Sequence, residues 1–199
     1  MSMLGDFLKR QDIDVALLQE VTHTEFTTIR EYNAIVNECT DKRGTAILAK
    51  TGLHLQNIKR IPSGRGITAV FQGIWKINIY APSGAEKRVE RECFFNNDVT
   101  VLISTDSADV IIAGDFNCVI SLADCTGKPT TSRALVTLIK GMVSVMYGKR
   151  TRTHHPTHIT PYDGASRINR IYITDPLKRR KQGAETVAAA FYDHFVLYV

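Results

Sequence analysis

The amino-acid sequence predicts an α/β fold in which two β-sheets pack face to face as a sandwich flanked by helices. In the first 80 residues, short apolar stretches are separated by Gly or polar turns, a spacing typical of strands that pair antiparallel. Two longer segments with helical periodicity and several more strand-like stretches follow. Strand blocks that alternate with packed helices are typical of layered α/β architectures.

The first part of the chain is expected to begin in a helix and continue in strands. Leu4, Phe7 and Leu8 have helical spacing and precede the basic pair Lys9 and Arg10, so a short amphipathic helix is predicted there. Apolar runs bounded by turn residues predict the strands that follow. The later elements are a strand over 13–18, a short helix over 24–30, and strands over 32–39, 45–49, 53–60, 66–72 and 75–80.

The second part is expected to hold the two longer helices. A loop of small residues over 81–84 leads into a segment whose apolar side chains fit one helical face, and the same pattern returns later. The predicted elements are a helix over 86–103, a strand over 110–113, a surface loop over 121–130, a helix over 131–143, and strands over 167–173, 186–191 and 195–199.

Composition bounds the function classes. The chain has 199 residues, of which 44% are hydrophobic, so residues 1–199 are predicted to form one domain with one core. Its longest apolar runs are too short to cross a bilayer, and its start lacks the order of a signal peptide. We therefore expect no membrane partner and a nuclear or cytoplasmic protein that is not secreted.

Charge and cysteine content add two weaker expectations. The net charge of +5 leans only mildly toward polyanionic partners. The four cysteines are widely scattered, which favours buried, reduced thiols over a structural zinc site. They are Cys39, Cys93, Cys118 and Cys125.

Polar side chains follow three apolar strand-like stretches at the point where each ends. Glu20 follows the first, Asp115 and Asn117 follow the run over 110–113, and Asp193 with His194 follows 188–191. Carboxylates are hard ligands suited to Mg²⁺ or Mn²⁺, and an imidazole titrates near neutral pH. Each residue alone fits an ordinary turn position, but together they predict metal-assisted attack on a phosphate.

In order and spacing, these segments resemble the endonuclease/exonuclease/phosphatase superfamily, and most closely the apurinic-type endonuclease domain of non-LTR retrotransposons. The matching segments are 18–20, 78–84, 114–117, 166–171 and 193–194. The resemblance implies a divalent-metal-dependent enzyme of that fold, which nicks one strand of duplex DNA by phosphodiester hydrolysis. A reverse transcriptase domain of the parent element is the further partner it implies.

The same resemblance implies a role for each site residue. Glu20 would be the principal metal ligand and Asp193 a second one, while His194 would contact the scissile phosphate and help to activate water. Asp115 and Asn117 would position water, phosphate and leaving group. The remaining catalytic positions are Tyr80, expected against the phosphate, and Asn169, which stands where the family has an Asp that orients the catalytic His.

The chain departs from the family pattern at three places. It starts inside the first helix, so we expect the preceding strand and its Asn to be missing, and it ends at Val199 within a predicted strand. It is therefore expected to be truncated at its start and to be part of something longer. Asn169 cannot stabilise an imidazolium as a carboxylate would. Tyr192 replaces a small hydroxyl residue that the family carries before Asp193.

Basic residues spread over several loops are the candidates for contact with DNA phosphates. They are Arg65, Lys149, Arg150, Arg152 and Arg167. His154, His155 and His158 could instead suggest a zinc site. Neighbouring His residues on a strand point to opposite faces, so a shared ion is not favoured.

Three functions stay open at this point. The first is the Mg²⁺-dependent endonuclease, and the second is a DNA-binding remnant of the same fold without activity. The third is hydrolysis of a phosphomonoester or inositol phosphate, since fold alone does not select the substrate. Basic loops and the 78–84 and 166–171 segments favour the first function over the third.

Overall fold

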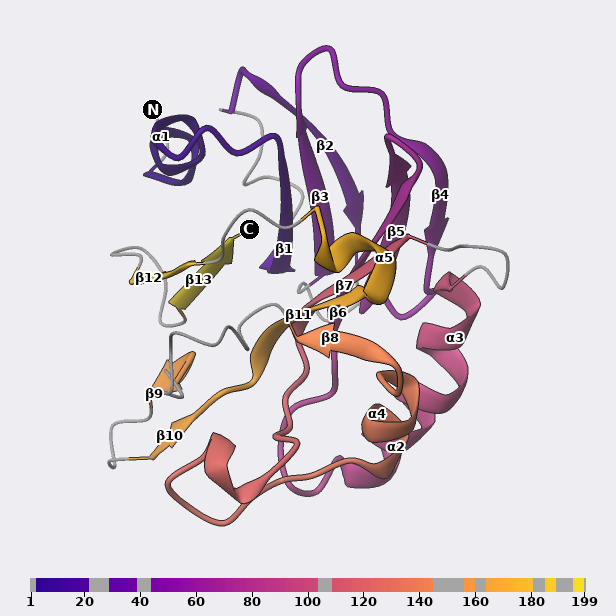
Figure 1. Cartoon of the computed structure of the whole chain (residues 1–199), viewed down its shortest axis with the longest axis vertical. Coiled ribbons are helices and arrows are strands. Elements are labelled where there is room, and N and C mark those ends of the chain that lie inside the picture. Colours follow the sequence, from indigo (N-terminus) through magenta and orange to yellow (C-terminus); the bar gives the residue numbers. More distant parts are fainter. Residues whose placement is uncertain are drawn as a thin grey trace.

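The structure, a computed structural model, describes residues 3–21, 29–38, 44–103, 109–144, 156–159, 164–180, 185–188 and 195–198. Two β-sheets face each other, with one helix outside the smaller sheet and a group of helices outside the larger one (Figure 1). The fold class predicted from the sequence is therefore confirmed. Among the described residues, no helix is long and apolar enough to span a membrane.

The smaller sheet has three antiparallel strands in the order β1-β3-β2. They are β1 (Val15–Val21), β3 (Gly44–Lys50) and β2 (Tyr32–Asn37). Helix α1 (Met3–Arg10) lies against the outer face of this sheet, where Phe7 and Leu8 pack on apolar side chains of the strands. The amphipathic spacing at the start of the chain thus buries one helical face, as predicted.

The larger sheet has six strands in the order β4-β5-β6-β7-β11-β8, and its only parallel neighbours among these are β6 and β7. The strands are β4 (Gln56–Arg60), β5 (Gly66–Phe71), β6 (Ile74–Tyr80), β7 (Val110–Asp115), β11 (Asn169–Thr174) and β8 (Met142–Ser144). The connection between the parallel strands β6 and β7 carries the main helices, as parallel strands require.

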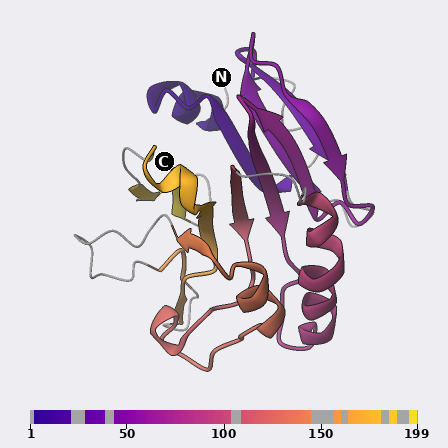
Figure 2. The ribbon, with the colours of Figure 1, turned by 45° about the vertical axis from the view of Figure 1, so that its right-hand side comes forward.

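Helices cover the outer face of the six-stranded sheet. Figure 2 shows α2 (Arg88–Cys93), the π-helical turn η2 (Phe94–Asp98) and α3 (Val99–Leu102) as one magenta column on the side away from α1. Together with α4 (Arg133–Leu138), this column buries the largest apolar cluster, which includes Phe94, Phe95 and Phe116. A second apolar layer lies between the two sheets, where Ile47 meets Ile67.

Two predicted segments differ in kind from the structure. The helix predicted over 131–143 ends at Leu138, because Gly141 takes a positive φ of 85° and the chain then enters strand β8. The predicted surface loop over 121–130 contains a short 3-10 turn, η3 (Leu122–Asp124), whose Asp124 is buried. The helix predicted over 24–30 lies largely outside the described residues.

Four short elements had no counterpart in the prediction, and two others were expected. The unexpected ones are β9 (His158–Ile159), β10 (Ala165–Ser166), α5 (Asp175–Lys178) and the strand β8. The expected pair, β12 (Glu185–Ala188) and β13 (Phe195–Tyr198), forms an antiparallel hairpin. Strands of two or three residues carry too little periodicity to be recognised from sequence.

Candidate functional site

Three predicted site residues form a row across the larger sheet. In the strand register, Asp115 of β7 lies opposite Tyr80 of β6 on one side and opposite Asn169 of β11 on the other. Residues opposite each other on neighbouring strands point to the same face of the sheet. The phenol, carboxylate and amide therefore line one strip at the strand ends, on the face that meets the smaller sheet.

Asp115 is a buried carboxyl group, with 4% of its surface exposed. Its Oδ1 accepts a hydrogen bond from the backbone N–H of Asn117 at 2.9 Å. The pKa of Asp115 is raised to about 7, mainly by burial and also by the negative charge of Glu20, while the Asn117 hydrogen bonds and the charge of Arg170 oppose the rise. The influence of Glu20 on this pKa places the two carboxylates near each other.

Glu20 reaches this strip through a β-bulge. The pairing of β1 with β3 shifts register between Gln19 and Val21, and Glu20 between them has a φ of +57°. A bulge leaves one residue outside the ladder and turns its side chain away from the ordinary alternation. Strand β1 packs against β6 and β7, and the charge of Glu20 acts on Asp115, so the bulged residue lies near the row that contains Asp115.

Asn117 stands in a tight turn that two anchors hold in place. Its Nδ2 donates to the carbonyl of Ala81 at 2.8 Å, and the N–H of Ala81 donates to the carbonyl of Asp115 at 2.9 Å. The preceding Phe116 is fully buried and packs edge-on against Tyr172, with 5.4 Å between ring centroids. The turn therefore joins the loop after β6 to the end of β7 with little freedom.

Glycine is the one residue type that fits position 114, directly before this turn. Its φ is +141°, and a Cβ added there would lie 2.0 Å from the carbonyl oxygen of Ile79 on the neighbouring strand. Only glycine combines that conformation with so close a backbone approach. Each residue of the Gly-Asp-Phe-Asn run thus has a local reason. Gly114 allows the close backbone approach, Asp115 is the buried acid, Phe116 packs in the core, and Asn117 bonds the loop after β6.

Arg65, which was predicted to contact DNA, lies beside Tyr80 at the candidate site. Its guanidinium carbon is 5.1 Å from the centroid of the Tyr80 ring, and its backbone carbonyl accepts the Tyr80 N–H at 2.8 Å. A guanidinium at this distance from an aromatic face is attracted to the ring. Arg65 thereby brings a positive charge to the edge of the strip.

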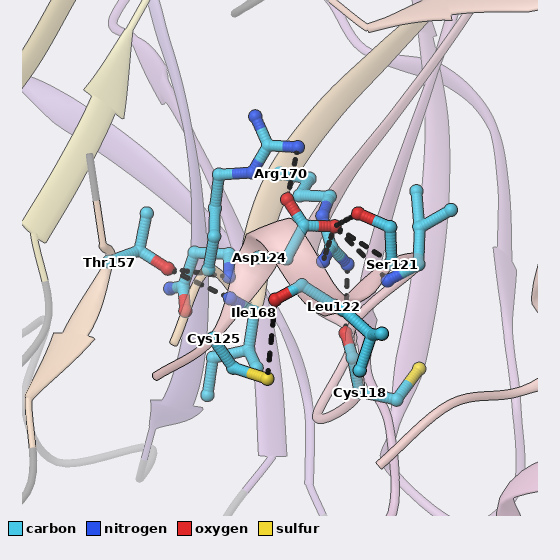
Figure 3. A network of polar contacts seen from close by, with 11 residues as sticks. Cys118, Ser121, Leu122, Asp124, Cys125, Thr157, Ile168 and Arg170 are labelled. Atoms are coloured by element: carbon cyan, nitrogen blue, oxygen red, sulfur yellow. Dashed lines mark hydrogen bonds and ion pairs between the residues drawn. The ribbon is translucent and has the colours of Figure 1, made fainter. Parts of the chain in front are cut away.

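A buried ionic network under the site was not foreseen from the sequence (Figure 3). Asp124 pairs with Arg167 at 2.7 Å and with Arg170 at 3.5 Å, and its Oδ2 also accepts the N–H of Ser121 at 3.2 Å. Arg170 donates in turn to the carbonyl of Cys118 at 2.8 Å. The network fastens the loop that follows Asn117 to strand β11.

Arg167 occupies a different setting from the one predicted. Its side chain is buried and ion-paired with the buried Asp124, and its backbone N–H donates to the Asp124 carbonyl at 2.8 Å. A DNA phosphate could reach this guanidinium only by displacing the paired carboxylate, which is costly for a buried pair. The geometry therefore favours a structural part for Arg167 and does not favour the predicted DNA contact.

Asn169 is held at the start of β11 by a second buried contact. The hydroxyl of Thr157 accepts the N–H groups of Asn169 and Ile168 at 2.9 and 3.0 Å, as Figure 3 shows. Thr157 lies in the segment 156–159, and no sequence-based prediction gave Thr157 itself a role in the site. The position opposite Asp115 is therefore fixed through the backbone.

The structure brings together Glu20, Tyr80, Asp115, Asn117 and Asn169. Several predicted residues lie outside the described part of the chain, namely Asp193, His194, Lys149, Arg150 and Arg152, together with Tyr192, His154 and His155. Three of the cysteines, Cys93, Cys118 and Cys125, are free thiols, but of these only Cys118 is buried as expected, and Cys93 is exposed.

The donor set of the described residues suits a hard divalent cation. Within that part of the chain, no three Asp, Glu, His or Cys side chains come together as a complete cage. Mg²⁺ is ordinarily held by one or two carboxylates, with water and substrate phosphate completing its coordination. Glu20 supplies one such carboxylate, and Asp115 and Asn117 add a carboxyl group and an amide that can contact water or phosphate beside it.

Comparisons with known proteins agree with this geometry. The sequence profile of the Endonuclease/Exonuclease/phosphatase family matches residues 1–191. Among solved structures, an AP endonuclease from Archaeoglobus fulgidus is similar with a TM-score of 0.79 and 18% identity, covering 98% of this chain and 91% of that chain. A search of curated protein sequences found no match.

Two other solved structures have the same fold. A 3'-5' exonuclease from Neisseria meningitidis (NExo) has a TM-score of 0.74 and 16% identity, covering 98% of this chain and 94% of that chain. A truncated TDP2 from Caenorhabditis elegans has a TM-score of 0.70 and 16% identity, covering 98% of this chain and 86% of the other. At such identities the likeness establishes the fold.

Proposed function

The chain belongs to the Endonuclease/Exonuclease/phosphatase family, and from this premise we propose that it is a divalent-metal-dependent endonuclease that nicks duplex DNA. The observation that supports the proposal most is the buried Asp115 at the strand ends, hydrogen-bonded to the Asn117 N–H and close enough to Glu20 for the charge of Glu20 to act on it. We further propose the retrotransposon type of this activity, as the motif resemblance implies, with Mg²⁺ or Mn²⁺ as the metal.

In the proposed reaction, water attacks phosphorus and the bond from phosphorus to the leaving sugar oxygen breaks. Glu20 would hold the metal, which when bound offsets the negative charge that builds on the phosphate. Asp115, whose pKa is about 7, is protonated in an appreciable fraction of molecules near neutral pH. It can therefore give its proton to the leaving oxygen, as a general acid whose pKa lies near the working pH.

The other described residues of the strip would position the substrate. The side chain of Asn117 is fixed by the Ala81 carbonyl at 2.8 Å, so it needs little reorganisation to meet a phosphate oxygen. Tyr80 lies in the same row as Asp115 and would pack against the phosphate. Activation of the water by His194 and metal binding by Asp193 remain proposals from the family resemblance.

Duplex DNA is the proposed partner. Arg65 lies on Tyr80 at the edge of the strip, where a cation would meet a phosphate next to the scissile one. Lys149, Arg150 and Arg152 are proposed to extend this contact along the DNA backbone, since phosphate contacts set position more than sequence preference. A reverse transcriptase domain of the parent element is the further partner that the resemblance implies.

Nicking of supercoiled plasmid in Mg²⁺ tests the proposal. We expect Glu20→Gln and Asp115→Asn each to lower the nicking rate by at least about 100-fold, the scale on which removed acid–base and electrostatic groups act. Asp109→Asn is the matched control, because Asp109 precedes the opposite end of β7 and pairs with Arg180 at 3.1 Å. Full activity in Glu20→Gln would rule out the proposed site.

A DNA-binding protein without turnover is the second candidate, and Asn169 favours it. It stands opposite Asp115 where the family has an acid, and an amide cannot stabilise an imidazolium. Under this candidate, wild type binds duplex DNA in a salt-dependent manner without nicking it. Asn169→Asp should then raise Mg²⁺-dependent nicking above the wild-type rate, and an unchanged rate would show that Asn169 is not the limiting defect.

A phosphomonoesterase, the third candidate, would differ from the other two because it would release inorganic phosphate. One similar structure is described as a 3' phosphatase bound to a product DNA hairpin. Release of inorganic phosphate from 3'-phosphorylated DNA or from small phosphate esters, with plasmid left intact, would replace the endonuclease proposal.

A further inference from the structure

We propose that Asn78 is a positioning residue whose side-chain amide clamps the two sheets together and thereby holds the Glu20 bulge in its metal-binding conformation. The inference rests on the proposed function, because it concerns the ligand of that same site. Asn78 lies on β6, two residues before Tyr80, and is fully buried. No motif argument assigned it a part.

The amide of Asn78 bonds to the opposite sheet through both of its polar atoms. Its Nδ2 donates to the carbonyls of Leu18 at 2.8 Å and Ala46 at 2.9 Å, and its Oδ1 accepts from Nε2 of Gln19 at 2.6 Å. Both N–H groups and the carbonyl oxygen are thus engaged. Two of the three partners are the residues that immediately precede Glu20.

The neighbouring Gln19 is itself fixed on both sides. Besides the bond to Asn78, its Nε2 donates to the carbonyl of Leu17 at 3.1 Å. The chain from Leu17 to Gln19 is therefore tied to β6 up to the residue before the bulge. With this segment fixed, the direction in which Glu20 leaves the strand is fixed as well.

The bulge needs such support. Glu20 has a φ of +57°, and the left-handed conformation costs a residue with a Cβ about 1–2 kcal/mol. Strained backbone of this kind persists where its surroundings over-determine it, and it concentrates at functional sites. Three hydrogen bonds to the buried Asn78 amide provide that restraint, since a hydrogen bond is stronger in a protein interior than in water.

The chain offers a matched control in Asn37. This second buried amide also joins the two sheets, because its Nδ2 donates to the carbonyls of Ile61 and Gly66, both at 2.9 Å. It lies on β2, two strands away from β1 in the sheet order. Replacing Asn37 removes two hydrogen bonds across the sandwich and replacing Asn78 removes three, but only Asn78 is bonded beside Glu20.

The experiment compares Asn78→Leu with Asn37→Leu. Leucine nearly preserves the volume and removes the hydrogen bonds. Mn²⁺ affinity is measured by titration calorimetry on protein without DNA, and amide hydrogen exchange is followed in metal-free protein over residues 17–21. We expect Asn78→Leu to weaken Mn²⁺ binding by about 10- to 100-fold, the scale found for residues that orient metal ligands, and to speed exchange at the bulge. Asn37→Leu should change Mn²⁺ affinity less than threefold.

A milder variant covers the case in which Asn78→Leu does not fold. Of the three hydrogen bonds to Asn78, Gln19→Leu removes only the part-buried one from Gln19. It should also weaken Mn²⁺ binding and speed amide exchange over residues 17–21. The inference would be overturned if the Asn78 or Gln19 variant showed the same Mn²⁺ affinity as Asn37→Leu and the same rate of amide exchange over residues 17–21. If wild type binds no Mn²⁺ and does not nick DNA, the proposed function fails. Amide exchange over residues 17–21 in the Asn78 and Asn37 variants then shows by itself whether Asn78 holds the bulge.

Discussion

Replacing Asp115 with Asn should stabilise the metal-free protein above neutral pH while removing its activity. The carboxyl group is buried, and its pKa lies at about 7 against an ordinary value of 3.8. Burial is the largest cause and the nearby charge of Glu20 adds to it. Asparagine has almost the same shape, keeps the acceptor for the Asn117 N–H, and cannot ionise.

The magnitude follows from the pKa difference. About 3 pKa units, at about 1.4 kcal/mol each, give about 4 kcal/mol. Because the pKa is raised in the folded state, the folded protein holds a proton that the unfolded chain releases. This contribution to stability is fully present below pH 3.8 and is lost as the pH rises to about 7. Above pH 7, wild type therefore carries the whole cost of ionising Asp115.

Urea denaturation at several pH values, with a chelator present, measures the effect. We expect Asp115→Asn and wild type to have similar free energies of unfolding at pH 4, and the variant to gain up to about 4 kcal/mol by pH 8. Asp109→Asn should show no such gain, because that partly exposed carboxylate pairs with Arg180. A difference between Asp115→Asn and wild type that stays constant from pH 4 to pH 8 would contradict a raised pKa of Asp115 in the folded protein.

Three further predictions follow from contacts around the site. Gly114→Ala should lower the free energy of unfolding by at least about 2 kcal/mol in urea, because the new Cβ would lie 2.0 Å from the Ile79 carbonyl; a loss below about 0.5 kcal/mol would contradict the close approach. Asp124→Ala should cost about 3–5 kcal/mol in the same assay, since it leaves two buried arginines without their counter-charge, and a neutral effect would show that the ion pairs are dispensable. Arg65→Ala should weaken binding to duplex DNA and reduce the slope of log affinity against log salt by about one, whereas an unchanged slope in fluorescence anisotropy would remove Arg65 from the DNA-binding surface.

Much of the architecture could be read from the sequence because it depends on local periodicity. The amphipathic start of the chain, the strands of both sheets other than β8, and the helix after the loop 81–84 appear close to their predicted ranges. The predicted helix over 131–143 was too long, since apolar spacing does not separate a helix that ends at Gly141 from a short strand that follows it.

The site was predictable in part for a similar reason. Asp115 and Asn117 belong to a compact run whose glycine, acid, aromatic and amide each meet a local requirement. Asp124 was assigned only to a surface loop, although it is the buried partner of Arg167 and Arg170. Its role depends on which strand lies beside the loop, and that cannot be seen from the loop's own composition.

The sequence alone determined which residues stand at the ends of buried strands, because the alternation of apolar and polar side chains is a property of consecutive residues. Tertiary structure decided which of these ends meet. Asn78 is bonded to Gln19 and Leu18 across 59 and 60 residues of chain, and Glu20 is turned toward Asp115 by a bulge in the pairing of β1 with β3. Such contacts depend on strand order and register, which are set when the two sheets pack their apolar faces together.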